Sequence, residues 1–226
     1  MATILIVGAD RGIAHAAALQ LRARGDHVIA ACLGSGQDLA ALGFEVMPGI
    51  DVTSDEAVAG LAATLAKRPV ALEWLFHVAG VLGMDELGQI DFQDMRRQFE
   101  INTLGPLRVA QALLPFLGAG AKVGIVTSRV GSLGDNGSGG IYAYRVSKAG
   151  ANMVALNLHH DLAKRGIAVV ALHPGMVATD LTKDYPGTFA YIQPEAAAAG
   201  LIARMDALTL ESSGQFRHAN GDQLAW

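Results

Sequence analysis

The sequence predicts an α/β fold in which a doubly wound parallel sheet is covered by helices on both faces. Short runs rich in Val, Ile, Leu and Ala alternate along the chain with longer segments of helical periodicity. Continuous apolar runs are typical of strands buried on both faces, and their alternation with helices indicates a parallel sheet. Because no linker or internal repeat interrupts this pattern, we expect one domain over residues 1–226.

Seven strands are expected, each a short apolar or β-branched run bounded by turn residues. They cover residues 3–7, 27–32, 44–47, 72–78, 122–127, 167–173 and 214–216. The helices expected between them cover residues 13–24, 37–42, 57–66, 92–116, 142–165 and 194–206. Ser54 is the expected N-cap of the third helix, and a break in the fourth is expected at Gly105-Pro106.

Composition excludes several classes of partner. The formal net charge is -4, and no cluster of Lys or Arg provides the basic surface that nucleic acid or an anionic membrane requires. Polar residues interrupt the most apolar stretches, so no membrane span is expected. Cys32 is the only cysteine, which rules out an intramolecular disulfide and a thiolate metal cluster. We expect Cys32 to be buried and, since no basic leader begins the sequence, a cytoplasmic protein.

A glycine-containing turn follows the first strand at the entry to the first helix. Its sequence is Gly8-Ala-Asp-Arg-Gly12-Ile-Ala14. Backbone amides at a helix N-terminus attract phosphate, and glycines let the chain approach it closely. The spacing differs from both the usual dinucleotide fingerprint and the Walker loop. Its position after the first strand nevertheless favours a nucleotide site over a simple turn.

Tyr144 and Lys148 lie four residues apart in a predicted helix, so their side chains share one face. A neighbouring cation favours the phenolate and lowers the pKa of a tyrosine from its usual value of about 10. Tyr144 is therefore a candidate general acid or base. Tyr142 is the alternative phenol, but it faces another side of the helix and is expected to form part of a pocket wall.

Together these motifs resemble the short-chain dehydrogenase/reductase family. The family's TGxxxGxG loop matches Gly8, Gly12 and Ala14, its NNAG segment matches residues 77–80, and its YxxxK motif matches the tyrosine and lysine described above. The resemblance extends from Thr3 to the end of the chain. It implies a Rossmann-type fold and an NAD(P)-dependent oxidoreductase that interconverts a carbonyl and an alcohol by hydride transfer.

The resemblance also implies a catalytic tetrad of Asn102, Ser128, Tyr144 and Lys148. Tyr144 would exchange the proton of the substrate oxygen, and Ser128 would stabilise the developing oxyanion. Lys148 would lower the tyrosine pKa and hold the cofactor ribose, while Asn102 would anchor a water. Ser132 competes with Ser128 for the serine role, and the Ser-x-x-Gly pattern favours Ser128.

Cofactor contacts are carried over from the family motifs. The residues implied are Gly8, Asp10, Arg11, Gly12, Ile13, Asp51, Val52, Ala79, Gly80, Tyr144, Lys148, Pro174, Gly175, Val177 and Thr179. At the end of the second strand, residues 31–35 contain neither an acid for a ribose hydroxyl nor an Arg for a 2'-phosphate. Arg11 then favours NADP over NAD, because a guanidinium pairs well with phosphate.

Two stretches narrow the resemblance to the C-factor and sniffer-like carbonyl reductase group: the glycine-rich loop before Tyr144 and the ending Gly-Asp-Gln-Leu-Ala-Trp. C-factor-like proteins include signalling proteins, so a signalling or nucleotide-sensing protein with little turnover stays open as the alternative function. The intact tetrad favours the enzyme.

Substrate contacts are expected from residues 181–190, including Pro186, and from residues 129–142, since loops carry specificity. The family resemblance implies self-association through the helices at 92–116 and 142–165, giving a homodimer or homotetramer. No metal is expected, because the adjacent His159 and His160 point in different directions and the other histidines lack a ligand pattern.

Overall fold

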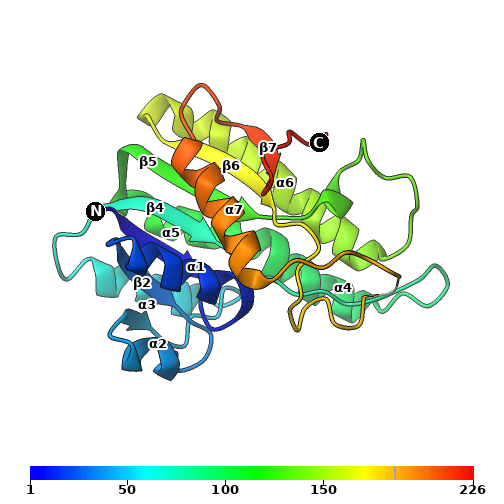
Figure 1. Cartoon of the computed structure of the whole chain (residues 1–226), viewed down its shortest axis with the longest axis horizontal. Coiled ribbons are helices and arrows are strands. Elements are labelled where there is room, and N and C mark those ends of the chain that lie inside the picture. The colour runs from blue at the N-terminus through cyan, green and yellow to red at the C-terminus, as the bar shows by residue number, and fades with distance from the viewer. Residues whose placement is uncertain (186) are drawn as a thin grey trace.

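The computed structural model describes residues 1–185 and 187–226, and its seven strands form one parallel sheet in the order β3-β2-β1-β4-β5-β6-β7 (Figure 1). The strands are β1 (Thr3–Val7), β2 (His27–Ala31), β3 (Glu45–Met47), β4 (Leu72–His77), β5 (Leu117–Val126), β6 (Ala168–His173) and β7 (Gln215–His218). The helices are α1 (Gly12–Ala23), α2 (Gln37–Ala41), α3 (Asp55–Leu65), α4 (Phe92–Phe99), α5 (Gly105–Leu113), α6 (Tyr142–Leu162) and α7 (Pro194–Ala207). Short 3-10 turns lie at Leu114–Phe116, Arg129–Gly131 and Ala163–Arg165.

Helices cover both faces of the sheet and create two hydrophobic cores. One core joins the sheet to α1 and α7, and the other joins it to α3, α5 and α6 (Figure 1). Side chains alternate along β1, so that Ile4 and Ile6 enter the first core while Leu5 and Val7 enter the second. The predicted doubly wound α/β fold is confirmed.

The order of the strands reverses at β1, which pairs with β2 on one side and with β4 on the other. In open parallel sheets, ligands bind outside the carboxyl ends of the strands at such a switch point. The sheet therefore places the loop after β1 and the segment after β4 at the expected ligand crevice.

Strand β5 begins five residues before its predicted start, at Leu117 rather than Lys122. Leu117 pairs with Leu72, and the register then shifts so that Lys122 pairs with Trp74. The intervening segment is rich in glycine and alanine, which are both depleted in strands, so its composition does not predict a strand there.

The predicted break at Gly105-Pro106 is absent. Instead a π-helical turn, Glu100–Leu104, joins α4 directly to α5 and contains Asn102. Proline lacks an N–H to donate, and Pro106 lies directly after the π-helical turn, at the second residue of α5. The wider π-helical turn therefore continues the helix through Gly105-Pro106 instead of ending it.

Several smaller predictions concern single residues. Ser54 is the N-cap of α3 and accepts a hydrogen bond from the amide of Ala57, as predicted. Cys32 is fully buried, which raises the pKa of its thiol to about 11. In the described part of the chain, no helix is both long enough and apolar enough to cross a membrane. No three or more His, Cys, Asp or Glu of those residues gather as a metal site.

Candidate active site

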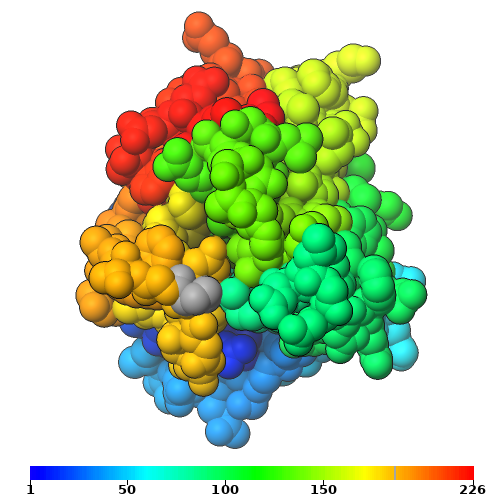
Figure 2. All heavy atoms as spheres, turned by 90° about the vertical axis from the view of Figure 1, so that its right-hand side faces the viewer, coloured from blue at the N-terminus to red at the C-terminus, as the bar shows by residue number. Residues whose placement is uncertain are grey.

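A cavity of about 810 Å³ opens at the carboxyl ends of the central strands. Its walls come from the loop after β1, the segment after β4, the start of α6 and the segment after β6. Figure 2 shows this side of the molecule, with the segment after β6 (yellow to orange) facing α4 (teal) and the blue N-terminal region visible between them. The volume falls within the range of about 300 to 1,000 Å³ that small-molecule and cofactor sites occupy.

The glycine loop approaches the segment after β4 too closely for a side chain. Gly8 has φ +87°, and a Cβ on it would lie 2.8 Å from the Cα of Ala79. The first helix begins at Gly12 with no side-chain cap, and its first turn contains no acidic residue. No side chain caps the amides at this helix start, so they can donate hydrogen bonds to a ligand, and the arrangement fits a phosphate group.

Asp10 places a carboxylate at the end of β2, although β2 and its following residues contain no acid. Its two oxygens accept hydrogen bonds from the amides of Leu33 and Gly34, both at 2.8 Å. Asp10 and Leu33 also line the cavity, beside the exposed Arg11. The residues at the strand end do not predict this carboxylate, because Asp10 and Leu33 are 23 residues apart in the sequence.

Three members of the predicted tetrad come together at the start of α6. Tyr144 is 7% exposed, Ser128 is 8% exposed and Lys148 is 4% exposed. The Ser128 side chain lies close enough to Tyr144 to lower the pKa of its phenol. The ammonium of Lys148 donates to the carbonyl of Val126 at 3.1 Å and lies 5.7 Å from the centre of the Tyr144 ring. Tyr144 and Lys148 both line the cavity.

Burial dominates the protonation of this group. It raises the pKa of Tyr144 above its usual value, and the neighbouring Ser128 side chain lowers that pKa only in part. Burial also lowers the pKa of Lys148, to about 8. The expected lowering of the tyrosine pKa by the lysine is therefore not seen in this state, because the loss of water around a phenolate outweighs a cation that is itself desolvated.

Asn102 fixes the architecture around the tetrad. Its side-chain oxygen accepts from the amide of Val81 at 2.9 Å, and its nitrogen donates to the carbonyl of Val81 at 2.8 Å and to the hydroxyl of Ser147 at 2.9 Å. The Ser147 hydroxyl in turn donates to the carbonyl of Tyr144 at 2.8 Å. A Cβ on Gly80 would lie 3.0 Å from the Asn102 oxygen and 3.3 Å from the Lys148 nitrogen, so Asn102 lies beside Lys148.

The two competing residues lie elsewhere. The hydroxyl of Ser132 donates to the carbonyl of Trp226, the last residue of the sequence, at 3.1 Å and accepts from the amide of Asp135 in its own loop at 3.0 Å. Tyr142, expected in the pocket wall, does not line this cavity. Both findings favour Ser128 and Tyr144 for the two roles.

Most of the predicted cofactor residues line the cavity. They are Gly8, Asp10, Arg11, Gly12, Ile13, Asp51, Val52, Ala79, Gly80, Tyr144, Lys148, Pro174 and Thr179. Gly175 and Val177 do not line it, because Val177 is buried and forms a parallel bridge with Ile192 while Gly175 faces His218.

The substrate end of the cavity mixes apolar and charged side chains. Leu181, Asp184 and Tyr185 line it, as expected for the loop at 181–190; Pro186 of that loop lies outside the described residues. Met84 and Arg97 also line it and were not predicted, whereas no residue of 129–142 does. The loop at 129–142 is instead hydrogen-bonded to α6: the guanidinium of Arg145 donates to the carbonyls of residues 130, 139 and 140.

Comparisons with known proteins agree with this geometry. The chain is 63% identical over 226 residues, covering 100% of both proteins, to 1-hydroxy-2-glutathionyl-2-methyl-3-butene dehydrogenase of Rhodococcus sp. (strain AD45). It is 44% identical over 155 residues to the C-signal of Myxococcus xanthus, covering 67% of this chain and 91% of that protein.

Solved structures are similar over the same length. The carbonyl reductase Sniffer of D. melanogaster matches with a TM-score of 0.90 and 26% identity, covering 100% of both chains. An NADPH-bound carbonyl reductase from chicken fatty liver matches with a TM-score of 0.89 and 27% identity, covering 100% of this chain and 99% of that one. The short chain dehydrogenase family model matches residues 2–188. The chain therefore belongs to the short-chain dehydrogenase family and is an NAD(P)-dependent oxidoreductase similar to the C-signal and Sniffer proteins.

Proposed function

We propose that the chain, acting as a single NAD(P)-binding domain over residues 1–226, interconverts a carbonyl and an alcohol with Tyr144 as the general acid or base. The observation that carries the proposal is that the buried Tyr144 and Lys148, with the buried Ser128 behind them, lie on the wall of the same cavity as the glycine loop; Ser128 itself does not line the cavity. A proton-transfer group and a phosphate-binding helix start thus share one enclosure.

Each residue has a distinct part in the mechanism. NAD(P), when bound, supplies or accepts the hydride. In reduction, Tyr144 donates its proton to the substrate oxygen, and its raised pKa keeps that proton available at neutral pH. Ser128 stabilises the charge that develops on the same oxygen. Lys148 brings positive charge beside the tyrosine and holds the cofactor, and Asn102 keeps Val81 and α6 in register and anchors a water that leads to Lys148.

For the cofactor we propose a preference for NADP over NAD. The exposed guanidinium of Arg11 on the cavity wall supports it, because it would pair with a 2'-phosphate. The carboxylate of Asp10 at the end of β2 acts in the opposite direction and limits the preference.

For the substrate we propose a primary alcohol that carries a glutathionyl thioether, oxidised to the aldehyde. The support is the 63% identity over the full length of the Rhodococcus dehydrogenase, whose name describes such an alcohol. The cavity also suits it: Met84 and Tyr185 offer apolar surface, while Arg97 and Asp184 offer both charges. A glutathionyl group has two carboxylates and one ammonium to pair with them.

The decisive test combines substrate and mechanism. Purified protein is assayed for NAD(P)H formation with the glutathionyl alcohol and, in the reverse direction, with small aldehydes and ketones. We expect turnover that Tyr144→Phe lowers by about 10² to 10⁴-fold, since general acid-base catalysis contributes that much. Normal turnover in Tyr144→Phe would refute the role of Tyr144. Turnover with simple carbonyls alone would refute the glutathionyl substrate.

We further propose a cytoplasmic homodimer or homotetramer. Cells hold their NAD(P) internally, which supports the location. The assembly is supported by exposed apolar side chains on the two packed helices α4 and α6, namely Phe92, Phe99, Val146 and Met153. Met153→Asp should shift the protein toward the monomer in light scattering. An unchanged mass would argue against assembly through α6.

A further inference from the structure

The loop after β4 reaches across to the start of the catalytic helix α6 and binds its free amides. One carboxylate oxygen of Asp85 accepts from the amide of Tyr142 at 2.5 Å, and the other accepts from the amide of Ala143 at 2.8 Å. The main-chain carbonyl of Asp85 also accepts from the amide of Ile141 at 3.2 Å. Asp85 thus caps a helix that begins 57 residues later in the sequence.

The local sequence of α6 has no cap of its own. Its N-cap position is Ile141, whose apolar side chain makes no capping hydrogen bond, and no acidic residue lies in the first turn. Ile141 also has φ +41° and is the only non-glycine residue with positive φ in the described part of the chain. A β-branched side chain disfavours that conformation. The three hydrogen bonds that Asp85 accepts therefore hold the helix start in a conformation that its own residues do not favour.

The same contacts join the substrate wall to the reacting phenol. Met84, next to Asp85, lines the cavity, and Tyr144 is the third residue of α6. We propose that Asp85 is a positioning residue, which acts through the first turn of α6 to keep Tyr144 in register with Ser128. A displacement of about 1 Å at a reacting group is enough to cost about 10²-fold in rate.

The inference rests on the proposed function of Tyr144, and its main test is Asp85→Asn. This change keeps the size of the side chain but turns one acceptor into a donor that faces an amide. We expect kcat to fall by about 10 to 10²-fold with little change in KM. The dissociation constant for NAD(P)H should stay within about twofold, because the glycine loop lies on other elements.

Asp91→Asn is the matched control. Asp91 lies in the same connection and caps α4, accepting from the amides of Gln93 at 2.8 Å and Asp94 at 3.3 Å, but it does not line the cavity. We expect this variant to keep kcat within about twofold. The inference is wrong if Asp85→Asn keeps normal kcat, if both variants lose kcat equally, or if the loss is explained by weaker NAD(P)H binding.

Two further measurements protect the test. If Asp85→Asn does not fold, Asp85→Glu replaces it, because glutamate keeps the charge. This variant should fold and lose less kcat than expected for Asp85→Asn. Normal kcat in Asp85→Glu together with normal amide exchange would contradict the inference. Hydrogen exchange needs no substrate: Asp85→Asn or Asp85→Glu should speed exchange at Tyr142 and Ala143, and Asp91→Asn should not. Wild-type protein with no turnover would refute the proposed function, while the exchange result would still decide whether Asp85 holds the helix start.

Discussion

The ammonium of Lys148 lies 5.7 Å from the centre of the Tyr144 ring, and both side chains are buried. Burial lowers the pKa of Lys148 to about 8 and raises that of Tyr144. The lysine, rather than the tyrosine, is therefore the group whose charge changes just above neutral pH.

This predicts a loss of carbonyl reduction at alkaline pH. We expect kcat/KM to fall above about pH 8 as Lys148 loses its proton, and we expect Lys148→Arg to keep its charge and move that fall upward by two pH units or more, from a lower plateau. Lys122→Arg is the control, because burial also lowers the pKa of Lys122, which lies on β5 outside the cavity. An unmoved fall in Lys148→Arg would mean that another group titrates.

A second prediction concerns cofactor choice. Asp10→Ser removes the carboxylate bound to the amides of Leu33 and Gly34, so NADPH should bind about tenfold more tightly relative to NADH. Arg11→Ala should change the ratio in the opposite direction. Titration of both variants with both cofactors measures the ratio. Equal changes in the dissociation constants of NADPH and NADH would show that neither side chain interacts with the 2'-phosphate.

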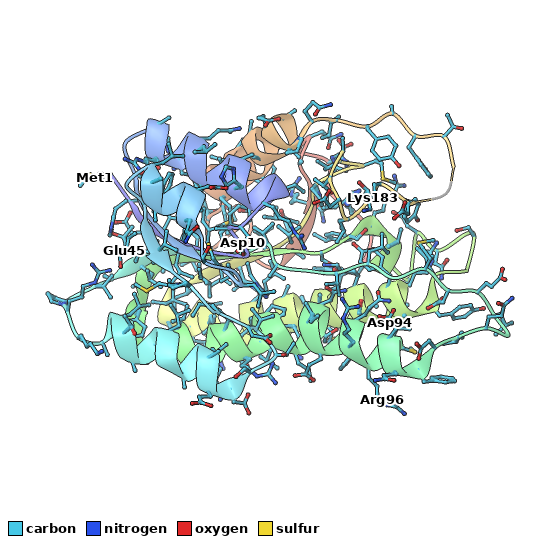
Figure 3. All side chains as sticks on the ribbon, turned by 90° about the horizontal axis from the view of Figure 1, so that it is seen from below. Met1, Asp10, Glu45, Asp94, Arg96 and Lys183 are labelled. Atoms are coloured by element: carbon cyan, nitrogen blue, oxygen red, sulfur yellow. The ribbon has the colours of Figure 1, made fainter. Side chains whose placement is uncertain are left out.

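A third prediction concerns the part that Arg97 plays in substrate binding. Arg97 lines the cavity and pairs with Asp94 at 2.8 Å. Arg97→Ala should raise KM for the glutathionyl alcohol about tenfold, by removing a cation from a carboxylate, and should leave KM for a small neutral carbonyl unchanged. Arg96→Ala is the control: Figure 3 shows Asp94 and Arg96 on opposite sides of α4, and Arg96 does not line the cavity. An equal rise in KM for both substrates would show that Arg97 does not bind the charged groups of the glutathionyl alcohol.

A fourth prediction concerns stability in acid. His77 is 2% exposed at the end of β4, neither ring nitrogen has a hydrogen-bond partner among the residues that the structure describes, and burial lowers its pKa to about 3. The unfolded chain takes up a proton near pH 6.5 while the folded chain does not, so stability is retained above that pH and lost below it. By pH 5 the loss from His77 should be about 2 kcal/mol.

Urea unfolding at pH 7 and pH 5 checks this prediction. His77→Asn should lose about 2 kcal/mol less than the wild type between the two pH values, even if it is less stable at pH 7. His160→Asn, at an exposed position on α6, should lose as much as the wild type. A His77→Asn protein with the wild-type pH dependence would show that His77 does not control acid unfolding.

Local patterns in the sequence were sufficient for the fold and for the centre of the candidate site. The alternating apolar runs predicted all seven strands, and the spacing of Tyr144 and Lys148 placed both on one face of one helix. Their catalytic roles stay predictions. What local patterns gave was the position of side chains that lie within a few residues of one another.

Contacts between distant segments could not be predicted in this way. Asp85 and Arg97 carry no distinctive local pattern. Asp10 lies in the predicted glycine loop, but its hydrogen bonds to the amides of distant residues, like those of Asp85, do not follow from a local pattern. The directions in which the pKa values of Tyr144 and Lys148 shift could not be predicted either. The spacing of two residues reveals a neighbouring charge, but not the burial whose effect on the pKa outweighs that charge.

The π-helical turn at Glu100–Leu104 suggests how such a site could acquire new substrates. A π-helical turn corresponds to one extra residue in a helix, and each residue of an α-helix turns the chain by about 100°. Deleting one residue before Asn102 would rotate α4 by that angle while Asn102 kept its hold on Val81. A different row of side chains, without Arg97, would then face the substrate. One inserted or deleted codon is therefore a short evolutionary route from one specificity to another that leaves the catalytic group intact.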